Sequence, residues 1–313
     1  MHKFQKIRRN KLIKWFAFLF MALNLAIITV TGLSYFYMSS MFERVVAEYN
    51  VSTVENVRTT LATNFSAGEK LAQEIYHTAE MGSLSKKSNL KDPSGYLAAG
   101  KLIDFIEYEL GSSSSLEGAY IYLSCSDTVI SEQGMFDARF FYESYAPHNE
   151  MTFDEWKSWI QERRQPFYQT ATLTYETYTA EVVEYYCPFN AYTDSSYGCV
   201  VLNYAPSLLL KPFDGCALLN SADIQIRYLP EQTQILSSGN TEINNYVYEQ
   251  DLKTGKTTLH STPFGKLIVI KQTSLDHNWE YIITLSANVF YERANFFTTV
   301  IVFFLGMEII VGS

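Results

Sequence analysis

The sequence predicts a mixed α+β protein: a long helix followed by two lobes built on antiparallel sheets, with an apolar segment near each end. Three observations carry this prediction. Apolar residues recur at steps of three and four over residues 47–79, the period of one helix face. Short stretches rich in Tyr, Val and Ile, separated by turn-forming residues, fill most of the chain from residue 117 onward. Strongly apolar segments cover residues 15–38 and 294–313.

Residues 1–14 form a basic N-terminus, and residues 15–38 are expected to form a first transmembrane helix. The segment from Trp15 to Met38 contains no charged residue. As a helix it spans about 36 Å, against a hydrocarbon core of about 30 Å. The lysines and arginines before it predict a cytoplasmic N-terminus and an extracellular region over residues 39–293. A cleaved signal peptide is the alternative, but its apolar region would be shorter and would end in small residues.

Residues 39–96 are expected to form a stalk helix and a loop. The predicted apolar face can pack on the protein's own lobes, on a second copy, or on both. A homodimer through the stalk and the transmembrane helices is the expected assembly. The turn-forming residues of the loop, 81–95, end the helix. The apolar or small residues of the face are Ala47, Val51, Val54, Val57, Leu61, Phe65, Gly68, Ala72, Ile75 and Ala79.

Residues 97–205 are expected to form the membrane-distal lobe. A helix over 97–110 is followed by a hairpin, from Glu117 to Cys125 and from Thr128 to Ser131. Two helical pieces come next, and the second begins at Thr152 with Glu155 at the capping-box position. Strands are predicted over 167–175, 180–189 and 198–204. Together these elements resemble a PAS-type lobe, one sheet flanked by helices.

Residues 206–293 are expected to form a smaller, membrane-proximal lobe of short antiparallel strands after a linker over 206–214. The predicted strands cover residues 217–220, 223–229, 233–239, 246–252, 257–262, 266–273 and 279–286. Residues 294–313 are expected to form a second transmembrane helix, truncated at or within its end, with Glu308 near that end.

Composition and motifs narrow the function classes. The net charge is −9 and the basic residues concentrate before residue 15, so the acidic remainder argues against nucleic acid as a partner. The four cysteines show no zinc spacing, and no metal site or cofactor is predicted. Cys187 and Cys199 flank a predicted hairpin. They are expected to be either free buried thiols or a disulfide-bonded pair. The pair Glu181 and Glu184 reads as a solvated strand face.

No catalytic constellation is visible, because the histidines are scattered and no nucleophile motif occurs. Three hypotheses follow: the sensory part of a transmembrane receptor, an adhesion or scaffolding ectodomain that binds a protein, and an extracellular hydrolase. The first is preferred.

Three local segments carry a resemblance to a known family. They are Pro166 to Ala171 (PFYQTA), Gly198 to Asn203 (GCVVLN) and Asn278 to Ile283 (NWEYII), in that order between the two apolar segments. They resemble motifs of the double Cache (dCache) sensor domains of bacterial receptors, over about residues 39–293. The resemblance implies two PAS-like lobes, a ligand in the distal lobe, and a cytoplasmic output domain, with histidine kinases and AraC-type regulators as the most similar receptors.

The resemblance also implies ligand contacts, and this chain departs from them. In members that bind amino acids, an arginine and an aspartate hold the two charged groups, whereas this chain has Gln165 and Asn203 there. We therefore expect a neutral or hydroxyl-rich small molecule, unless Arg164 reaches the pocket. Aromatic residues on the predicted strands and helix complete the candidate ligand-binding set: Tyr120, Tyr122, Trp156, Phe167, Tyr168 and Tyr185.

Overall fold

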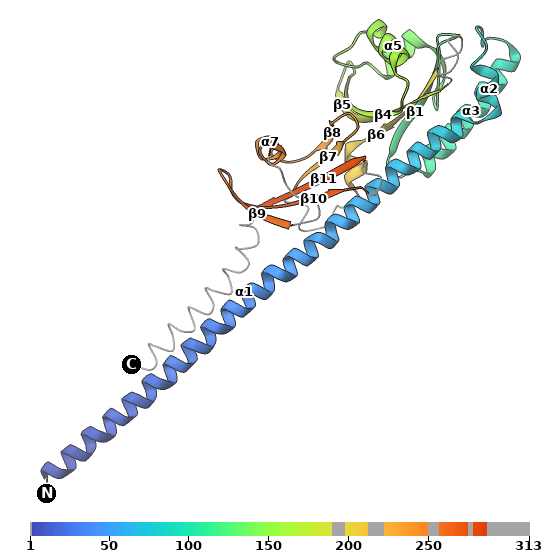
Figure 1. Cartoon of the computed structure of the whole chain (residues 1–313). Helices are drawn as coiled ribbons and strands as arrows, with labels where there is room; N and C mark the ends of the chain where they lie inside the picture. Colours follow the sequence, from blue (N-terminus) through green and yellow to red (C-terminus); the bar gives the residue numbers. More distant parts are fainter. Residues whose placement is uncertain (1, 190–197, 212–221, 250–256, 275–277, 287–313) are drawn as a thin grey trace. The chain divides into compact units, whose positions relative to one another are not determined.

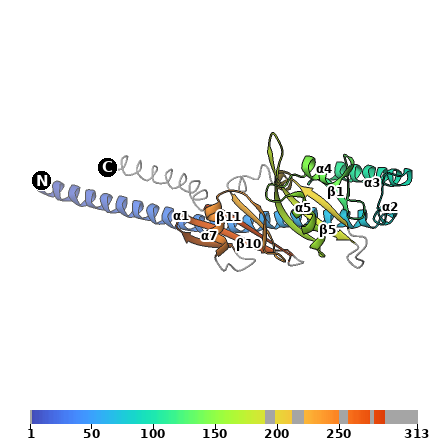
Figure 2. The ribbon, with the colours of Figure 1, turned by 90° about the horizontal axis from the view of Figure 1, so that it is seen from above.

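The structure is a computed structural model that describes residues 2–189, 198–211, 222–249, 257–274 and 278–286 (Figures 1 and 2). Contacts divide the chain into two units. One comprises Thr53–Thr258 and Val269–Leu285, and the other comprises Met1–Ser52, Leu259–Ile268 and Ser286–Ser313. Every site discussed below lies in the first unit. The predicted mixed α+β class with antiparallel sheets is confirmed, while the predicted domain boundaries stay a prediction.

Helix α1 (His2–Tyr76) runs without interruption through the first apolar segment and the predicted stalk. The described apolar side chains between Trp15 and Tyr37 are exposed. Among the residues that the structure describes, no helix contains a stretch both long and apolar enough to cross a membrane. The predicted second transmembrane helix, 294–313, lies outside the described residues.

The predicted apolar face of the stalk helix is confirmed where its side chains are described. Val57, Leu61, Phe65, Ala72 and Ile75 are buried, as is Gly68. The face ends before Ala79, which is exposed and begins the short helix α2 (Ala79–Leu84), whose residues 81–84 were predicted as loop. The side chains at positions 47, 51 and 54 lie outside the described part. Helix α3 (Pro93–Ser112) follows, and the side chain of Asp92 caps its first turn.

Six antiparallel strands form the sheet of the lobe that follows. They are β1 (Leu116–Leu123), β2 (Thr128–Ser131), β3 (Gly134–Asp137), β4 (Phe167–Thr174), β5 (Thr179–Phe189) and β6 (Gly198–Tyr204), in the order β3-β2-β1-β6-β5-β4. The predicted bounds of β6 are reproduced. Strand β3 was missed, since its first two residues were assigned to no element and its last two to a helical piece over residues 136–145.

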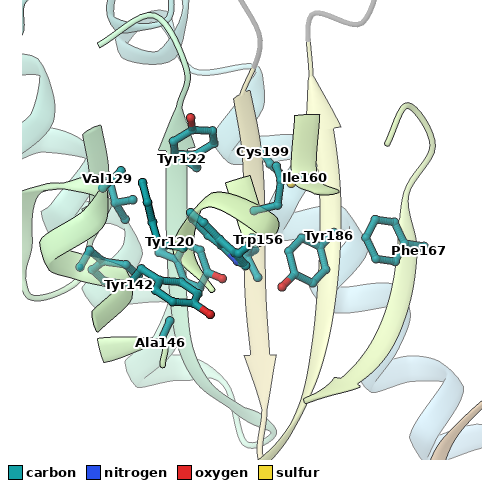
Figure 3. Packing of buried hydrophobic residues seen from close by; sticks show 14 residues of the cluster. Tyr120, Tyr122, Val129, Tyr142, Ala146, Trp156, Ile160, Phe167, Tyr186 and Cys199 are labelled. Atoms are coloured by element: carbon teal, nitrogen blue, oxygen red, sulfur yellow. The ribbon is translucent and has the colours of Figure 1, made fainter. Parts of the chain in front are cut away.

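The two faces of this sheet pack against different partners. One face, here called the α5 face, is covered by α4 (Ala138–Tyr145) and α5 (Phe153–Glu162), whose predicted capping box at Thr152 and Glu155 is present. Figure 3 shows Trp156 of α5 over the sheet between Tyr120 and Tyr186. The opposite face, here called the stalk face, packs on α1.

On the stalk face, Phe65 of α1 lies against two tyrosines of the sheet. Its ring centroid is 5.3 Å from that of Tyr168 and 5.4 Å from that of Tyr204. Because successive side chains of a strand point to opposite faces, the neighbours Phe167 and Asn203 point to the α5 face instead. This alternation decides which of the predicted site residues lie together.

A second sheet has the order β8-β7-β11-β10-β9. Its strands are β7 (Ala222–Tyr228), β8 (Thr233–Ser237), β9 (Thr257–Thr262), β10 (Gly265–Thr273) and β11 (Trp279–Ser286), and the short helix α6 (Pro206–Leu210) precedes them. The strand predicted over 246–252 is wrong, because helix α7 (Thr241–Glu249) occupies its described part. The side chain of Asn240 accepts hydrogen bonds from the backbone N of Glu242 and Ile243, which starts this helix. The strand predicted over 217–220 lies outside the described residues.

Cys187 and Cys199 are both free and buried. They lie on the adjacent strands β5 and β6, where Cys187 pairs with Val200 and Pro188 with Cys199. This offset of one residue directs the two thiols to opposite faces of the sheet, so a disulfide between them does not form.

Candidate functional site

A cavity of about 350 Å³ opens on the α5 face of the six-stranded sheet, and we call it the Asn203 cavity. Such a volume lies in the range of small-molecule sites. Side chains from α4, from four strands and from two turns line it: Glu117, Tyr120, Glu132, Gln133, Phe141, Tyr145, Leu173, Tyr175, Tyr178, Val182 and Asn203. Two carboxylates and several aromatic rings therefore face one space, and no lysine or arginine is among the described residues that line it.

Strand pairing brings Asn203 to the cavity wall. In the register of the sheet, Asn203 of β6 pairs with Gly118 of β1 on one side and with Glu184 of β5 on the other. Its Oδ1 is buried and makes no hydrogen bond to the described residues. A buried polar atom without a partner costs free energy, so this atom is suited to a ligand that supplies the missing hydrogen bond.

Glu132 sits in the turn between β2 and β3, above the same end of β1. Its Oε2 lies 3.5 Å from the backbone N of Ala119, which donates to it. Its Oε1 lies 3.7 Å from the position a β-carbon would take on Gly118. Burial raises the pKa of the Glu132 carboxyl above its ordinary value, because the charged form is poorly solvated there.

Tyrosines form the opposite wall of the Asn203 cavity. The rings of Tyr175 and Tyr178 stack with centroids 4.6 Å apart at the turn between β4 and β5. The Tyr175 hydroxyl donates a 3.0 Å hydrogen bond to the carbonyl oxygen of Tyr145, which ties this turn to the end of α4. The wall is thus assembled from two segments that are separate in sequence.

Beneath the cavity wall, a network of buried polar side chains surrounds Glu184. Its Oε2 lies 3.0 Å from Nε2 of His148 and accepts hydrogen bonds from the Tyr186 hydroxyl at 2.7 Å and from Gln169 Nε2 at 2.9 Å. The segment that carries His148 is fixed on β4, where the backbone N of Thr174 donates to the carbonyl oxygen of Pro147 at 2.8 Å.

The pKa values of this pair are shifted toward the charged forms. Burial alone would raise the pKa of Glu184, but the charge of His148 and the hydrogen bonds to the carboxylate hold it below its ordinary value. Burial alone would lower the pKa of His148, and the Glu184 carboxylate more than offsets this, so that the net shift is upward. The surroundings of the two buried side chains therefore favour the charged form of each.

The predicted ligand-binding residues on the α5 face fall into two groups. Tyr120 and Asn203 line the Asn203 cavity. Tyr122, Trp156 and Phe167 belong to the packed core of that face. The Tyr122 hydroxyl donates to Asp127 Oδ1 at 3.1 Å and accepts from Gln161 Nε2 at 3.3 Å.

The remaining predicted residues lie away from this face. Tyr168 and Tyr185 pack against each other on the stalk face, with ring centroids 4.6 Å apart and the ring planes tilted by 35°. The Tyr168 hydroxyl donates a 3.0 Å hydrogen bond to Glu69 of α1. Arg164 and Gln165 are exposed, and Arg164 donates to the carbonyl oxygen of Gln161 at 2.7 Å. The nine predicted residues do not line one cavity, and their ligand contacts stay a prediction.

Sequence reasoning missed Glu132, His148 and Glu184. A glutamate in a turn has no pattern that distinguishes it from a solvated one, so no signal identified Glu132. For Glu184, the interpretation as a solvated strand face is wrong, since Glu184 is fully buried while Glu181 is exposed. The available signal was strand parity, because Glu184 lies two residues from Tyr186 and shares its face. Within the described ranges, no group of three or more His, Cys, Asp or Glu residues is arranged to hold a metal ion.

No family model and no curated protein matches this chain. Solved structures do match. The extracellular domain of vpHK1S-Z8, described as a histidine kinase, has a TM-score of 0.50 and 11% identity, covering 82% of this chain and 96% of that one. The ligand-binding domain of Mlp24 with asparagine gives 0.45 and 12%, covering 82% and 98%. The domain of the Pseudomonas aeruginosa PAO1 amino acid chemoreceptor PctC with GABA gives 0.48 and 8%, covering 77% and 99%.

The comparison with vpHK1S-Z8 shows the fold. A long helix followed by two antiparallel sheets is the α+β architecture that this chain shares with that extracellular domain. This fold agrees with the double Cache architecture that the sequence resemblance implied.

Proposed function

We propose that this chain is the ligand-sensing region of a transmembrane receptor, and that a small polar organic molecule binds in the Asn203 cavity. In this proposal, binding shifts the balance between two arrangements of the lobe. The membrane helices pass the shift to a cytoplasmic output domain of the histidine kinase or AraC type. A ligand changes such a balance only by its different affinity for the two states.

One observation carries the proposal: a sensor-type fold encloses a cavity whose wall contains the buried, unpartnered Oδ1 of Asn203. A nearby hydroxyl, that of Tyr120, is also buried and makes no hydrogen bond of good geometry to the described residues. Packed cores seldom leave polar atoms in this state unless a ligand or water completes them. The Mlp24 and PctC domains carry small molecules according to their descriptions.

The membrane part of the proposal rests on the sequence. We propose that residues 15–38 and 294–313 cross the membrane, that residues 39–293 lie outside the cell, and that two chains associate through these helices and the stalk. The exposed apolar side chains of α1, from Trp15 to Tyr37, are compatible with a lipid environment.

Ligand binding is tested by thermal unfolding of the full chain in detergent micelles against a panel of small metabolites. A binding compound raises the midpoint temperature in proportion to its concentration and affinity. The variant Gly118→Val places a branched side chain in the cavity wall, where the backbone needs no glycine conformation. We expect it to fold and to lose the response. A response that survives in Gly118→Val rules out this cavity.

Topology is tested by cysteine labelling of intact cells in a variant without the native cysteines. A membrane-impermeant reagent is expected to reach Ser113→Cys, which lies at the end of α3, and to miss Gln5→Cys. The reverse pattern would overturn the proposed orientation. Cross-linking of a cysteine introduced at the exposed Ser66 of α1 tests the dimer, and a purely monomeric product would exclude it.

A further inference from the structure

We infer that the ligand of the Asn203 cavity is a small organic cation, an amine that is protonated at neutral pH and has no carboxylate, and that Glu132 is its counter-charge. This inference rests on the proposed function, since it names the class of ligand for the same cavity. The sequence led us to expect a neutral ligand, because Gln165 and Asn203 replace two charged residues. Glu132, which sequence reasoning missed, changes that expectation.

Glu132 is placed beside Asn203 by the sheet. Gly118 pairs with Asn203 in the register of β1 and β6, and Oε1 of Glu132 lies 3.7 Å from the β-carbon position of that glycine. The carboxylate and the unpartnered amide oxygen therefore lie at the same end of the cavity. Both atoms accept hydrogen bonds, and an ammonium group supplies up to three donors to such a pair.

The charge of Glu132 has no counter-charge from the described residues. No ion pair among them includes it, and its one hydrogen bond to a neighbouring strand comes from the backbone N of Ala119 at a long 3.5 Å. A partly buried carboxylate without a cation is costly, and a bound cation removes that cost. The raised pKa of the carboxyl is the expected result of this environment in the unliganded protein.

The rest of the cavity suits the organic part of an amine. Phe141, Tyr145, Tyr175 and Tyr178 line it, and aromatic faces attract cations as well as apolar chains. The charged side chains that a ligand carboxylate would meet there are those of Glu117 and Glu132, since the described lining contains no basic side chain. The cavity thus favours a cation over a zwitterion or an anion.

The test uses the full chain in detergent micelles and three matched sets of compounds. The amines are ethanolamine, putrescine and phenethylamine, the neutral matches are ethylene glycol, 1,4-butanediol and 2-phenylethanol, and the anions are glycolate, succinate and 3-phenylpropanoate. We expect at least one amine to raise the unfolding temperature at neutral pH, and its neutral and anionic matches to have no effect. If the alcohols or the carboxylates stabilise the protein and the amines do not, the inference is overturned while the proposed function stands.

Two variants locate the charge. Glu132→Gln keeps the size of the side chain and is expected to weaken amine binding about tenfold or more, the loss of one partly buried charge pair. Glu107→Gln removes an exposed carboxylate of α3 that does not line the cavity and is the matched control, with affinity unchanged. Equal affinity in Glu132→Gln and the wild type excludes Glu132 as the counter-charge. If no compound of the three sets stabilises the protein, this inference fails, and the broader panel with Gly118→Val then decides the proposed function separately.

Discussion

Nε2 of His148 lies 3.0 Å from Oε2 of Glu184, and both side chains are buried between β4, β5 and the segment that joins α4 to α5. This ion pair connects the helical cover of the lobe to its sheet. Because the neighbouring turn and α4 also form the wall of the Asn203 cavity, the pair stabilises the framework in which the cavity sits.

Removing the carboxylate leaves a histidine that is buried without its counter-charge. We expect Glu184→Ala to lower the free energy of unfolding by about 3–5 kcal/mol, as is typical when one member of a buried pair is deleted. Urea denaturation measures this directly. Glu181→Ala, on the same strand but exposed, is the matched control and should change the value by less than about 0.5 kcal/mol. Similar losses in both variants would contradict a structural role for the pair.

The same pair predicts a pH dependence of stability. The pKa of His148 is raised above its ordinary value of 6.5. The stability that His148 contributes is therefore fully present below pH 6.5 and is lost as the pH rises through the raised pKa. The pKa of Glu184 is lowered below its ordinary value of 4.5. The stability that Glu184 contributes is therefore fully present above pH 4.5 and is lost as the pH falls through the lowered pKa. The stabilisation by the pair is therefore greatest between pH 4.5 and 6.5.

This pH profile is measured by urea denaturation at a series of pH values. In His148→Gln the decline above pH 6.5 should be reduced, because the group that loses its proton is gone. A decline of the same size in the variant would mean that other groups cause it.

Tyr168 contacts the stalk rather than the cavity, since its hydroxyl donates to Glu69. We expect Tyr168→Phe to lower the free energy of unfolding by about 1.5–3 kcal/mol, the value of a hydrogen bond to a charged group. Its response to cavity ligands should persist. Tyr108→Phe removes a hydroxyl from an exposed ring of α3 and serves as control. Loss of the ligand response in Tyr168→Phe, with the fold intact, would support the contact that the sequence predicted for Tyr168.

Gly68 of α1 faces Tyr204, and a β-carbon there would clash with the tyrosine hydroxyl and lie 2.9 Å from its ring carbon Cζ. We expect Gly68→Ala to destabilise the protein by about 1–3 kcal/mol through this overpacking. Gly100→Ala, in the interior of α3 with no atom within 4 Å of the new β-carbon, should instead stabilise by about 0.5–1 kcal/mol. Adding Tyr204→Phe to Gly68→Ala should recover part of the loss, whereas strictly additive effects would argue against the contact.

Some features of the fold could be predicted because they depend on local chemistry. The capping box at Thr152 and Glu155 is a short-range signal, and strand β6 has a continuous apolar run with clear ends. The helix over Thr241–Glu249 was missed because its cap, Asn240, lies in a segment whose tyrosine and valine content resembles a strand.

The candidate site was harder to predict, for a geometric reason. Phe167 and Tyr168 are neighbours in sequence, so they point to opposite faces of the sheet and do not share a pocket. The Asn203 cavity combines β1, β6, α4 and two turns, and only the tertiary register brings Glu132 and Asn203 together.

Strand β6 ends with two consecutive residues that serve different parts of the lobe. Asn203 lines the cavity on one face, and Tyr204 packs over Gly68 of α1 on the other. Consecutive Cα atoms are about 3.8 Å apart, so the residue that lines the cavity and the residue that contacts α1 are separated by a single peptide unit. If a ligand binds at Asn203 as proposed, a displacement of β6 reaches α1 through the contact of Tyr204 with Gly68. Under the proposed function, changing the size of residue 68 or 204 should then alter the size of the response to a ligand without altering which ligand the cavity selects.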